Sequence, residues 1–332
     1  MSDGFNLRLR RPRPSVVACS PTLGALGAVN LMPACFAKED ALEARIARSS
    51  RRRRAVSVLL RWLTYLAAAV TAAVLLFVVG YILVRGVPAL TPDLFQWEYT
   101  SENVSLLPAL ASTVIMALLA LALAVPVGVG AAIYLVEYAR RGSRFVRLVR
   151  VTAETLQGIP SIIYGLFGML FFVTACGWGL SLLSGACTLA IMVLPVIMRT
   201  TEEALMAVPD SYREGGFGLG AGRLRTVARC VLPSAVPGIL GGVILALGRC
   251  VGEVAALLFT AGTVAQIPDF GAQGIFALFD SCRTLAVHMY TLACEGLHVN
   301  EAYATSVVLL ILVLLLNAAM RVVAQKMEVS KK

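Results

Sequence analysis

Long runs of apolar residues without charge constrain this chain more than any other feature. Several of them exceed the roughly 18 residues that mark a transmembrane helix. Hydrophobic residues make up 58% of the 332 residues and charged residues only 14%, whereas soluble domains are about 45–50% apolar and about 25% charged. The chain is therefore expected to be an integral membrane protein.

The apolar runs predict an all-α polytopic fold with six membrane-spanning helices. The expected spans cover residues 62–84, 106–137, 155–175, 180–200, 236–262 and 303–324. The second run is too long for one straight span, and Pro126, which two glycines follow, predicts a kink in it. Together the spans define a transmembrane domain over residues 61–325.

Charges in the connecting segments predict the orientation. Residues 138–150 hold five arginines and no acid, and residues 201–233 hold four more arginines. The loops 85–105 and 263–302 each hold one arginine and three or more acids. Because basic loops stay in the cytoplasm, both termini and the 201–233 loop are expected inside, in a bacterial inner (plasma) membrane. Twelve of the 29 basic residues lie before residue 62, and most of the others lie in two short connections and the C-terminal tail. Such charge holds segments in the cytoplasm, so nucleic acid is not an expected partner.

The two ends of the chain are expected to lie outside the membrane. Residues 1–60 predict a basic cytoplasmic tail that is largely disordered, since prolines interrupt its mildly apolar part and argue against a signal peptide. Residues 38–50 can form a short amphipathic helix on the membrane surface, and Met32 is an alternative start of the protein. Residues 326–332 predict a short cytoplasmic tail.

A charged, glycine-rich segment separates two apolar runs. It reads "SYREGGFGLGAGRLRTVARCVLP" over residues 211–233. Its pattern predicts a short helix, a glycine-centred turn at residues 220–222, and a second basic helix that ends before Pro233. Two helices that meet at such a turn would protrude on the cytoplasmic face. The alternative is an amphipathic loop that lies on the lipid headgroups.

This loop resembles the cytoplasmic "EAA…G…LP" loop of ABC importer permeases, which docks on an ATPase subunit. Glu214 and Gly220 stand at its first matched positions, and Leu232 with Pro233 at its last. Gly215 and Gly216 replace the two alanines of the pattern. Each glycine should loosen the helix by roughly 1 kcal/mol relative to alanine.

Four further motifs make residues 60–325 similar to the phosphate-uptake permeases. They are "GIPSIIYGLFG" (158–168), "RTTEEALMAVPDSYRE" (199–214), "LPSAVPGILGGVILALGRCVGEVAALLFTAG" (232–262) and "LLLNAAMRV" (314–322). The "ALLFTAG" ending and the last apolar run resemble the PstA type more than the PstC type. One departure is "GEVAA" in place of "GETAP", so Val254 and Ala256 replace threonine and proline.

The resemblance implies a type I ABC importer permease with a coupling helix, the membrane-spanning subunit of an ATP-driven importer of inorganic phosphate. It implies four partners besides membrane lipid and phosphate: a second, PstC-like permease, two copies of a PstB-like ATPase, and a periplasmic PstS-like binding protein. The sequence holds no Walker-type loop, so the chain itself is not expected to be an enzyme or to need a cofactor. A permease for a related oxyanion and a passive anion channel are the alternatives.

Two ionisable residues, Arg249 and Glu253, lie in the fifth apolar run, where a charge costs on the order of 2.5–3.5 kcal/mol. Spaced i, i+4, they could pair on one helix face as a scaffold. Alternatively, the Arg249 guanidinium could bind phosphate oxygens while Glu253 orients it. The resemblance implicates the arginine at this position in transport.

Three further residues are candidates for the substrate pathway. Arg199 of the "RTTE" motif either contacts the substrate or is an ordinary inside-facing charge. Ser161 and Tyr164 of "GIPSIIYG" could line the pathway, although close helix packing through glycines is the alternative. Glu154 is expected to pair with Arg147 or Arg150.

The outer loop gathers two cysteines and both histidines of the chain. Cys282, His288, Cys294 and His298 lack the spacing of a zinc site, so no metal is expected. In an oxidising compartment a Cys282–Cys294 disulfide is one alternative, and two free thiols are the other.

Overall fold

The computed structural model describes the backbone of residues 28–100, 102–140 and 142–329. Within these ranges it contains helices and turns but no strand, as the sequence predicts. The chain divides into two compact units, Met1–Leu76 and Phe77–Lys332. Helix α1 (Ala28–Gly86) crosses this boundary, and the first 27 residues of the expected cytoplasmic tail lie outside the described ranges.

The second unit holds the remaining helices. They are α2 (Leu107–Ile133), α3 (Arg144–Gln157), α4 (Ser161–Gly168), α5 (Leu182–Met206), α6 (Asp210–Gly218), α7 (Arg223–Thr226), α8 (Leu232–Val251), α9 (Ala255–Thr260), α10 (Phe270–Gln273), α11 (Leu285–Glu295) and α12 (Val299–Val329). Three π-helical turns extend them, at Tyr134–Tyr138, Met169–Ala175 and Val227–Val231.

Six stretches of the described chain have the length and composition of membrane spans. Five are continuous helical stretches: Val56–Ala89, Leu107–Tyr138, Leu182–Met206, Arg223–Val251 and Val299–Val322. The sixth is a helix pair, Arg144–Gln157 with Ser161–Ala175, that bends by 101°. The six predicted spans therefore have counterparts in the structure, but the third and the fifth differ from the expectation.

The third span is not a straight helix over residues 155–175. It breaks at residues 158–160, because Pro160 has no N–H and disfavours a helical conformation in the residue before it. The carbonyl of Leu156, which would face that missing N–H, accepts a hydrogen bond from the Tyr164 hydroxyl at 2.8 Å. Helix α3 before the break has apolar side chains exposed along one side, including Phe145 and Leu148, as in helices that lie at a membrane interface.

The predicted bounds of the fifth span are also wrong at both ends. It was expected over residues 236–262, but α8 ends at Val251 and the short α9 follows after a break at residues 252–254. At its other end the helix does not stop before Pro233. The π turn lets the Leu232 N–H bond to the Val227 carbonyl, five residues back, so the helix widens before the proline and continues from Arg223 into α8.

Helix α5 lies at the centre of the second unit, where α2 and α8 pack along it. Its side chains at Leu189, Val193 and Ile197 are fully buried. Small residues bring the neighbouring backbones close: a methyl group added at Gly128 of α2 would lie 3.0 Å from the Ile197 side chain. Such close approach is how helices associate within lipid. Pro126 lies inside α2, which continues through it.

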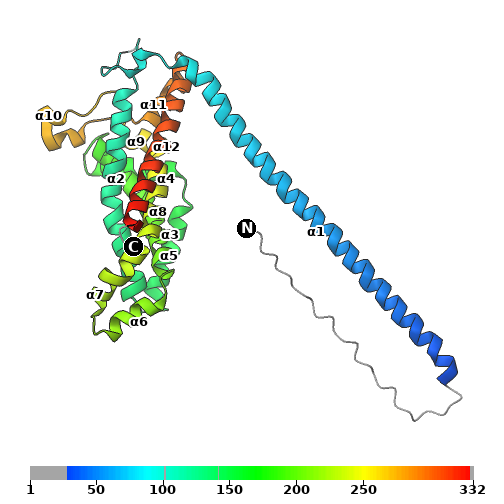
Figure 1. The fold of residues 1–332 in the computed structure, drawn as a ribbon. Coiled ribbons are helices and arrows are strands. Elements are labelled where there is room, and N and C mark those ends of the chain that lie inside the picture. The colour runs from blue at the N-terminus through cyan, green and yellow to red at the C-terminus, as the bar shows by residue number, and fades with distance from the viewer. Residues whose placement is uncertain (1–27, 101, 141, 330–332) are drawn as a thin grey trace. The chain divides into compact units, whose positions relative to one another are not determined.

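The two ends of this unit differ in structure. Figure 1 shows α6 and α7 at one end, while α10 lies at the opposite end. At the latter end the loop before α11 is fastened to α2, because the Leu285 N–H donates to the Thr113 hydroxyl at 2.7 Å. Cys282 is buried and Cys294 is exposed, and both are free thiols, so the disulfide alternative is not borne out.

Two buried polar side chains, Arg283 and His288, lie in the same segment as these thiols. The Arg283 guanidinium lies 4.9 Å from the centre of the Tyr99 ring, and its side chain is only 5% exposed. His288 is fully buried beside them. Burial, and then the neighbouring Arg283, lower the pKa of His288 from 6.5 to about 3. Burial likewise raises the pKa of the Cys282 thiol to about 12.

Candidate translocation pathway and coupling loop

Arg249 lies in the last turn of α8, next to the break in the fifth span. Its side chain is half-buried, and among the described residues it makes no ion pair. The alternative of a scaffold pair with Glu253 is therefore not borne out. Helix α8 has already ended at Val251, so the i, i+4 geometry no longer applies, and the Glu253 carboxylate instead accepts the Ala256 N–H at 3.3 Å.

The corner between α3 and α4 packs into the same buried cluster as the last turn of α8, which carries Arg249. Tyr164 of α4 shares this cluster with Leu247 and Cys250, so the fold brings two of the predicted pathway residues into one region. The backbones of α4 and α9 also meet here, because a Cβ at Gly165 would lie 2.9 Å from the Ala256 Cα. Ser161 begins α4 and is half-buried. Tyr164 itself is buried and bonded to Leu156, which favours a structural role for this side chain.

Arg199 belongs to a second, separate cluster between α3 and α5. Its guanidinium pairs with Glu154 and with Glu203, each at 3.2 Å. The expected pairing of Glu154 with Arg147 or Arg150 is corrected: the C-terminal half of α5 brings Arg199 to it instead. The Arg150 Nε donates to Glu202 at 2.6 Å.

These side chains line a cleft of about 170 Å³. Its charged lining consists of two arginines and three glutamates, Arg150, Glu154, Arg199, Glu202 and Glu203. As it stands the cleft has an excess of negative charge, so it does not attract an anion. Arg199 and Glu154 are also about half exposed, and exposed pairs contribute little to stability. An anion could therefore compete with the carboxylates for Arg199 at small energetic cost.

The loop that resembles the "EAA" pattern forms two helical arms, as the sequence predicts. Helix α6 carries Glu214, which is exposed, and the turn that follows has Gly220 in the left-handed region at φ +75°. Gly216 is the close contact of the two arms, since a Cβ there would lie 2.6 Å from a Thr226 side-chain atom, whereas Gly215 faces open space.

The ends of this loop pattern have different environments. Leu232 and Pro233 form the first turn of α8 and are half-buried against the bundle. At the tip of the loop, by contrast, Leu219 is 91% exposed and Leu224 is 73% exposed. Apolar side chains gathered at the surface in this way are typical of a protein contact site.

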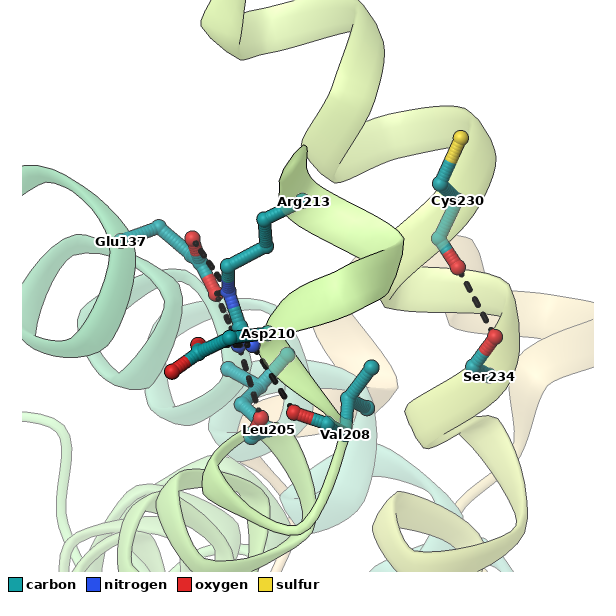
Figure 2. Close-up of polar contacts among 7 residues, drawn as sticks. All are labelled: Glu137, Leu205, Val208, Asp210, Arg213, Cys230 and Ser234. Carbon is teal, nitrogen blue, oxygen red and sulfur yellow. Dashed lines mark hydrogen bonds and ion pairs between the residues drawn. The ribbon is translucent and has the colours of Figure 1, made fainter. Parts of the chain in front are cut away.

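Arg213 of α6 is a functional candidate that the sequence analysis missed. Figure 2 shows its guanidinium between the Glu137 carboxylate, in the π turn that follows α2, and the backbone carbonyls of Leu205, in the last turn of α5, and of Val208 just after it. The Nη2 lies 2.7 Å from Glu137, and the side chains of Arg213 and Glu137 are only 15% and 7% exposed. The hydrogen bond to Glu137, more than its charge, raises the pKa of Arg213. The two residues lie 76 positions apart, so no local pattern points to the pair.

Residues 124–329 match the family described as the binding-protein-dependent transport system inner membrane component. The chain belongs to this family. It is therefore a multi-pass inner membrane protein, and the predicted all-α permease fold is confirmed.

Three relatives illustrate the match. The chain is 36% identical over 270 residues to a probable ABC transporter permease protein, YqgI, of Bacillus subtilis strain 168, which covers 77% of this chain and 90% of that protein. It is 33% identical over 249 residues to the phosphate transport system permease protein PstA of Pasteurella multocida, with coverages of 73% and 84%. It is 31% identical over 258 residues to a PstC of Mesorhizobium japonicum, with coverages of 70% and 77%.

The fold is also similar to a solved structure. A chain of a bacterial ABC transporter involved in the import of the acidic polysaccharide alginate superposes with a TM-score of 0.58. The match covers 80% of this chain and 96% of that one at 15% identity. It supports the type I ABC importer permease fold, and at this identity it supports the fold alone.

Proposed function

We propose that this chain is the PstA-type membrane subunit of an ATP-driven importer of inorganic phosphate. It forms the translocation pathway with a second, PstC-like permease, while a pair of ATPase subunits supplies the energy. A periplasmic phosphate-binding protein delivers the substrate. The relatives named as phosphate permeases, which align over most of the chain, support this choice of substrate.

The observation that carries the proposal is Arg249. A cation within a membrane-spanning helix costs on the order of 2.5–3.5 kcal/mol, and among the described residues no carboxylate pairs with this one. An anionic substrate is the partner that would offset this cost. The planar guanidinium can make two parallel hydrogen bonds to phosphate oxygens, and the break after α8 opens the backbone beside it.

The coupling loop connects the permease to the ATPase that would supply the energy for transport. Residues 201–233 lie in the cytoplasm, with both termini, and the α6–α7 arms dock on the ATPase through the exposed apolar tip. The position of these arms at the end opposite α10 (Figure 1) supports this orientation. Arg199 serves as a second contact for the anion near the inner end of the pathway, once it leaves Glu154 and Glu203.

Uptake of radiolabelled phosphate by a strain that lacks this gene, complemented with variants, tests the substrate role. Arg249→Gln should reach the membrane with its partners but lose uptake, and Arg249→Lys should lose it in part, because lysine keeps the charge without the fork. Glu253→Gln is the matched control, since an amide oxygen can still accept the Ala256 N–H. Normal phosphate uptake by Arg249→Gln would contradict the role of Arg249.

Two further outcomes separate the alternative functions. Uptake of labelled sulfate in place of phosphate by the complemented strain would indicate a permease for a related oxyanion. Phosphate flux through reconstituted vesicles without ATP would indicate a passive anion channel. The proposal requires flux that depends on ATP, on the ATPase and on the binding protein.

A further inference from the structure

Arg213 uses every hydrogen-bond donor of its guanidinium. The five N–H groups of an arginine form a planar fork. The Nε contacts both carboxylate oxygens of Glu137, at 3.1 and 3.4 Å. The Nη1 donates to the Val208 carbonyl at 2.9 Å and to Asp210 at 3.1 Å. The Nη2 donates to Glu137 at 2.7 Å and to the Leu205 carbonyl at 3.0 Å.

Apart from Asp210, which lies in α6 itself, these acceptors belong to three different segments of the fold. Glu137 lies in the π turn that ends α2, Leu205 in the last turn of α5, and Val208 in the link from α5 to α6. Figure 2 shows the guanidinium in the middle of this group. The α6 backbone itself packs on α7 and the following π turn. Arg213 is therefore the polar link that ties α6 to the inner ends of both α2 and α5.

The C-terminal half of α5 is in turn bonded to α3. Glu202, less than one turn before Leu205, binds Arg150 of α3, and Arg199 binds Glu154. Helix α3 leads directly into the corner at residues 158–160, where the Tyr164 hydroxyl donates to the Leu156 carbonyl. Tyr164 packs in the same buried cluster as Cys250, the residue next to Arg249. A displacement of α6 thus has polar contacts along which to reach this corner, and buried packing from there to the candidate substrate site.

We propose that Arg213 is the positioning residue that makes the coupling helix and the inner ends of α2 and α5 move as one body, with Glu137 as its anchor. It rests on the proposed function, because an ATPase must move α6. Without this Arg213–Glu137 clamp, α6 would still bind the ATPase through its exposed face. Its motion would then bend the α5–α6 link instead of moving α2 and α5. ATP would then be hydrolysed without a matching movement of phosphate.

The test is the number of phosphates imported per ATP hydrolysed, measured in vesicles that contain the complete transporter and binding protein. Arg213→Lys keeps the charge but has only three donors on a point charge, so the ratio should fall by about 5-fold or more. Glu137→Gln should lower it in the same way. ATP hydrolysis and capture of the ATPase should stay within about 2-fold of the parent protein. Arg321→Lys is the matched control, because Arg321 is exposed on α12, outside the coupling loop, and should leave the ratio unchanged.

The outcomes separate this inference from the proposed function. A parent transporter that imports no phosphate with ATP would refute the proposed function itself. If the parent is active, and Arg213→Lys and Glu137→Gln have the same phosphate-to-ATP ratio as the parent, only the role of the Arg213–Glu137 clamp would be refuted. A parallel fall of hydrolysis and import, with an unchanged ratio, would also overturn it, since that result indicates a merely structural residue. If Glu137→Gln does not assemble, the Arg213→Lys ratio decides.

Discussion

Two neighbouring glycines of the coupling helix should respond oppositely to the same substitution. Alanine favours a helix interior over glycine by roughly 0.5–1 kcal/mol, and this gain is shared by Gly215→Ala and Gly216→Ala because both lie inside α6. They differ in their surroundings. A Cβ at 215 meets no atom within 4 Å, whereas one at 216 lies 2.6 Å from the Thr226 methyl and 2.8 Å from its hydroxyl. Overpacking of this kind costs about 1–3 kcal/mol.

Hydrogen exchange of the 210–226 amides, followed by mass spectrometry on the assembled transporter, measures the difference. The helix-propensity gain cancels between the variants, so their difference is the overpacking cost alone. About 1–3 kcal/mol corresponds to exchange that is about 5- to 150-fold faster in Gly216→Ala than in Gly215→Ala. Adding Thr226→Ala removes the methyl and the hydroxyl, and should restore slow exchange to Gly216→Ala. Equal exchange in the two single variants would refute the packing of α6 on α7.

Three other predictions follow from separate features. Gly220→Ala places a side chain at φ +75° and should weaken ATPase capture by about 5- to 30-fold, about 1–2 kcal/mol. Gly218→Ala should leave capture unchanged, and equal affinities of the two variants in a titration with the ATPase would contradict the prediction. Because burial holds the pKa of His288 at about 3, below its unfolded value, its contribution to stability is complete above pH 6.5 and is lost as the pH falls from 6.5 toward 3. Thermal unfolding of His288→Leu should therefore change less between pH 7 and pH 5 than that of the parent. A membrane-impermeant maleimide added outside intact cells should label the exposed Cys294 but not the buried Cys282, and a Cys294 that is labelled only after the membrane is opened would refute the outer-loop assignment.

Features with a local physical cause could be predicted from the sequence. The number of spans follows from the length of the uncharged runs, and the two-armed loop follows from a glycine turn between charged helices. Both predictions depend only on residues that are close together in the sequence. The i, i+4 pairing of Arg249 with Glu253 was predicted by the same local reasoning, and it fails because it assumes that the helix continues. Gly252 between them was the one available signal of a break.

Contacts between distant segments could not be predicted in this way. Arg213 and Glu137 lie on different helices, and each looks alone like an ordinary charge near the end of a span. Glu154 is 45 positions from Arg199 but only a turn from Arg150, so reasoning from nearby residues chose the wrong partner. Pro233 misled for a related reason: a proline ends an α-helix by default, and only the wider π turn before it removes the conflict.

That π turn makes the chain between the coupling loop and α8 tolerant of one change in length. A π turn amounts to one inserted residue, and removing a residue from Val227–Val231 would restore a regular helix. The helix beyond would keep its orientation, because the wider turn absorbs the extra residue, and Arg249 would stay on the same face. A deletion in the regular part of α8 would instead rotate everything beyond by about 100°, the angle between successive residues of an α-helix. Homologues with and without the inserted residue could therefore place the arginine alike, and a one-residue gap at this turn would trace the descent of this helix.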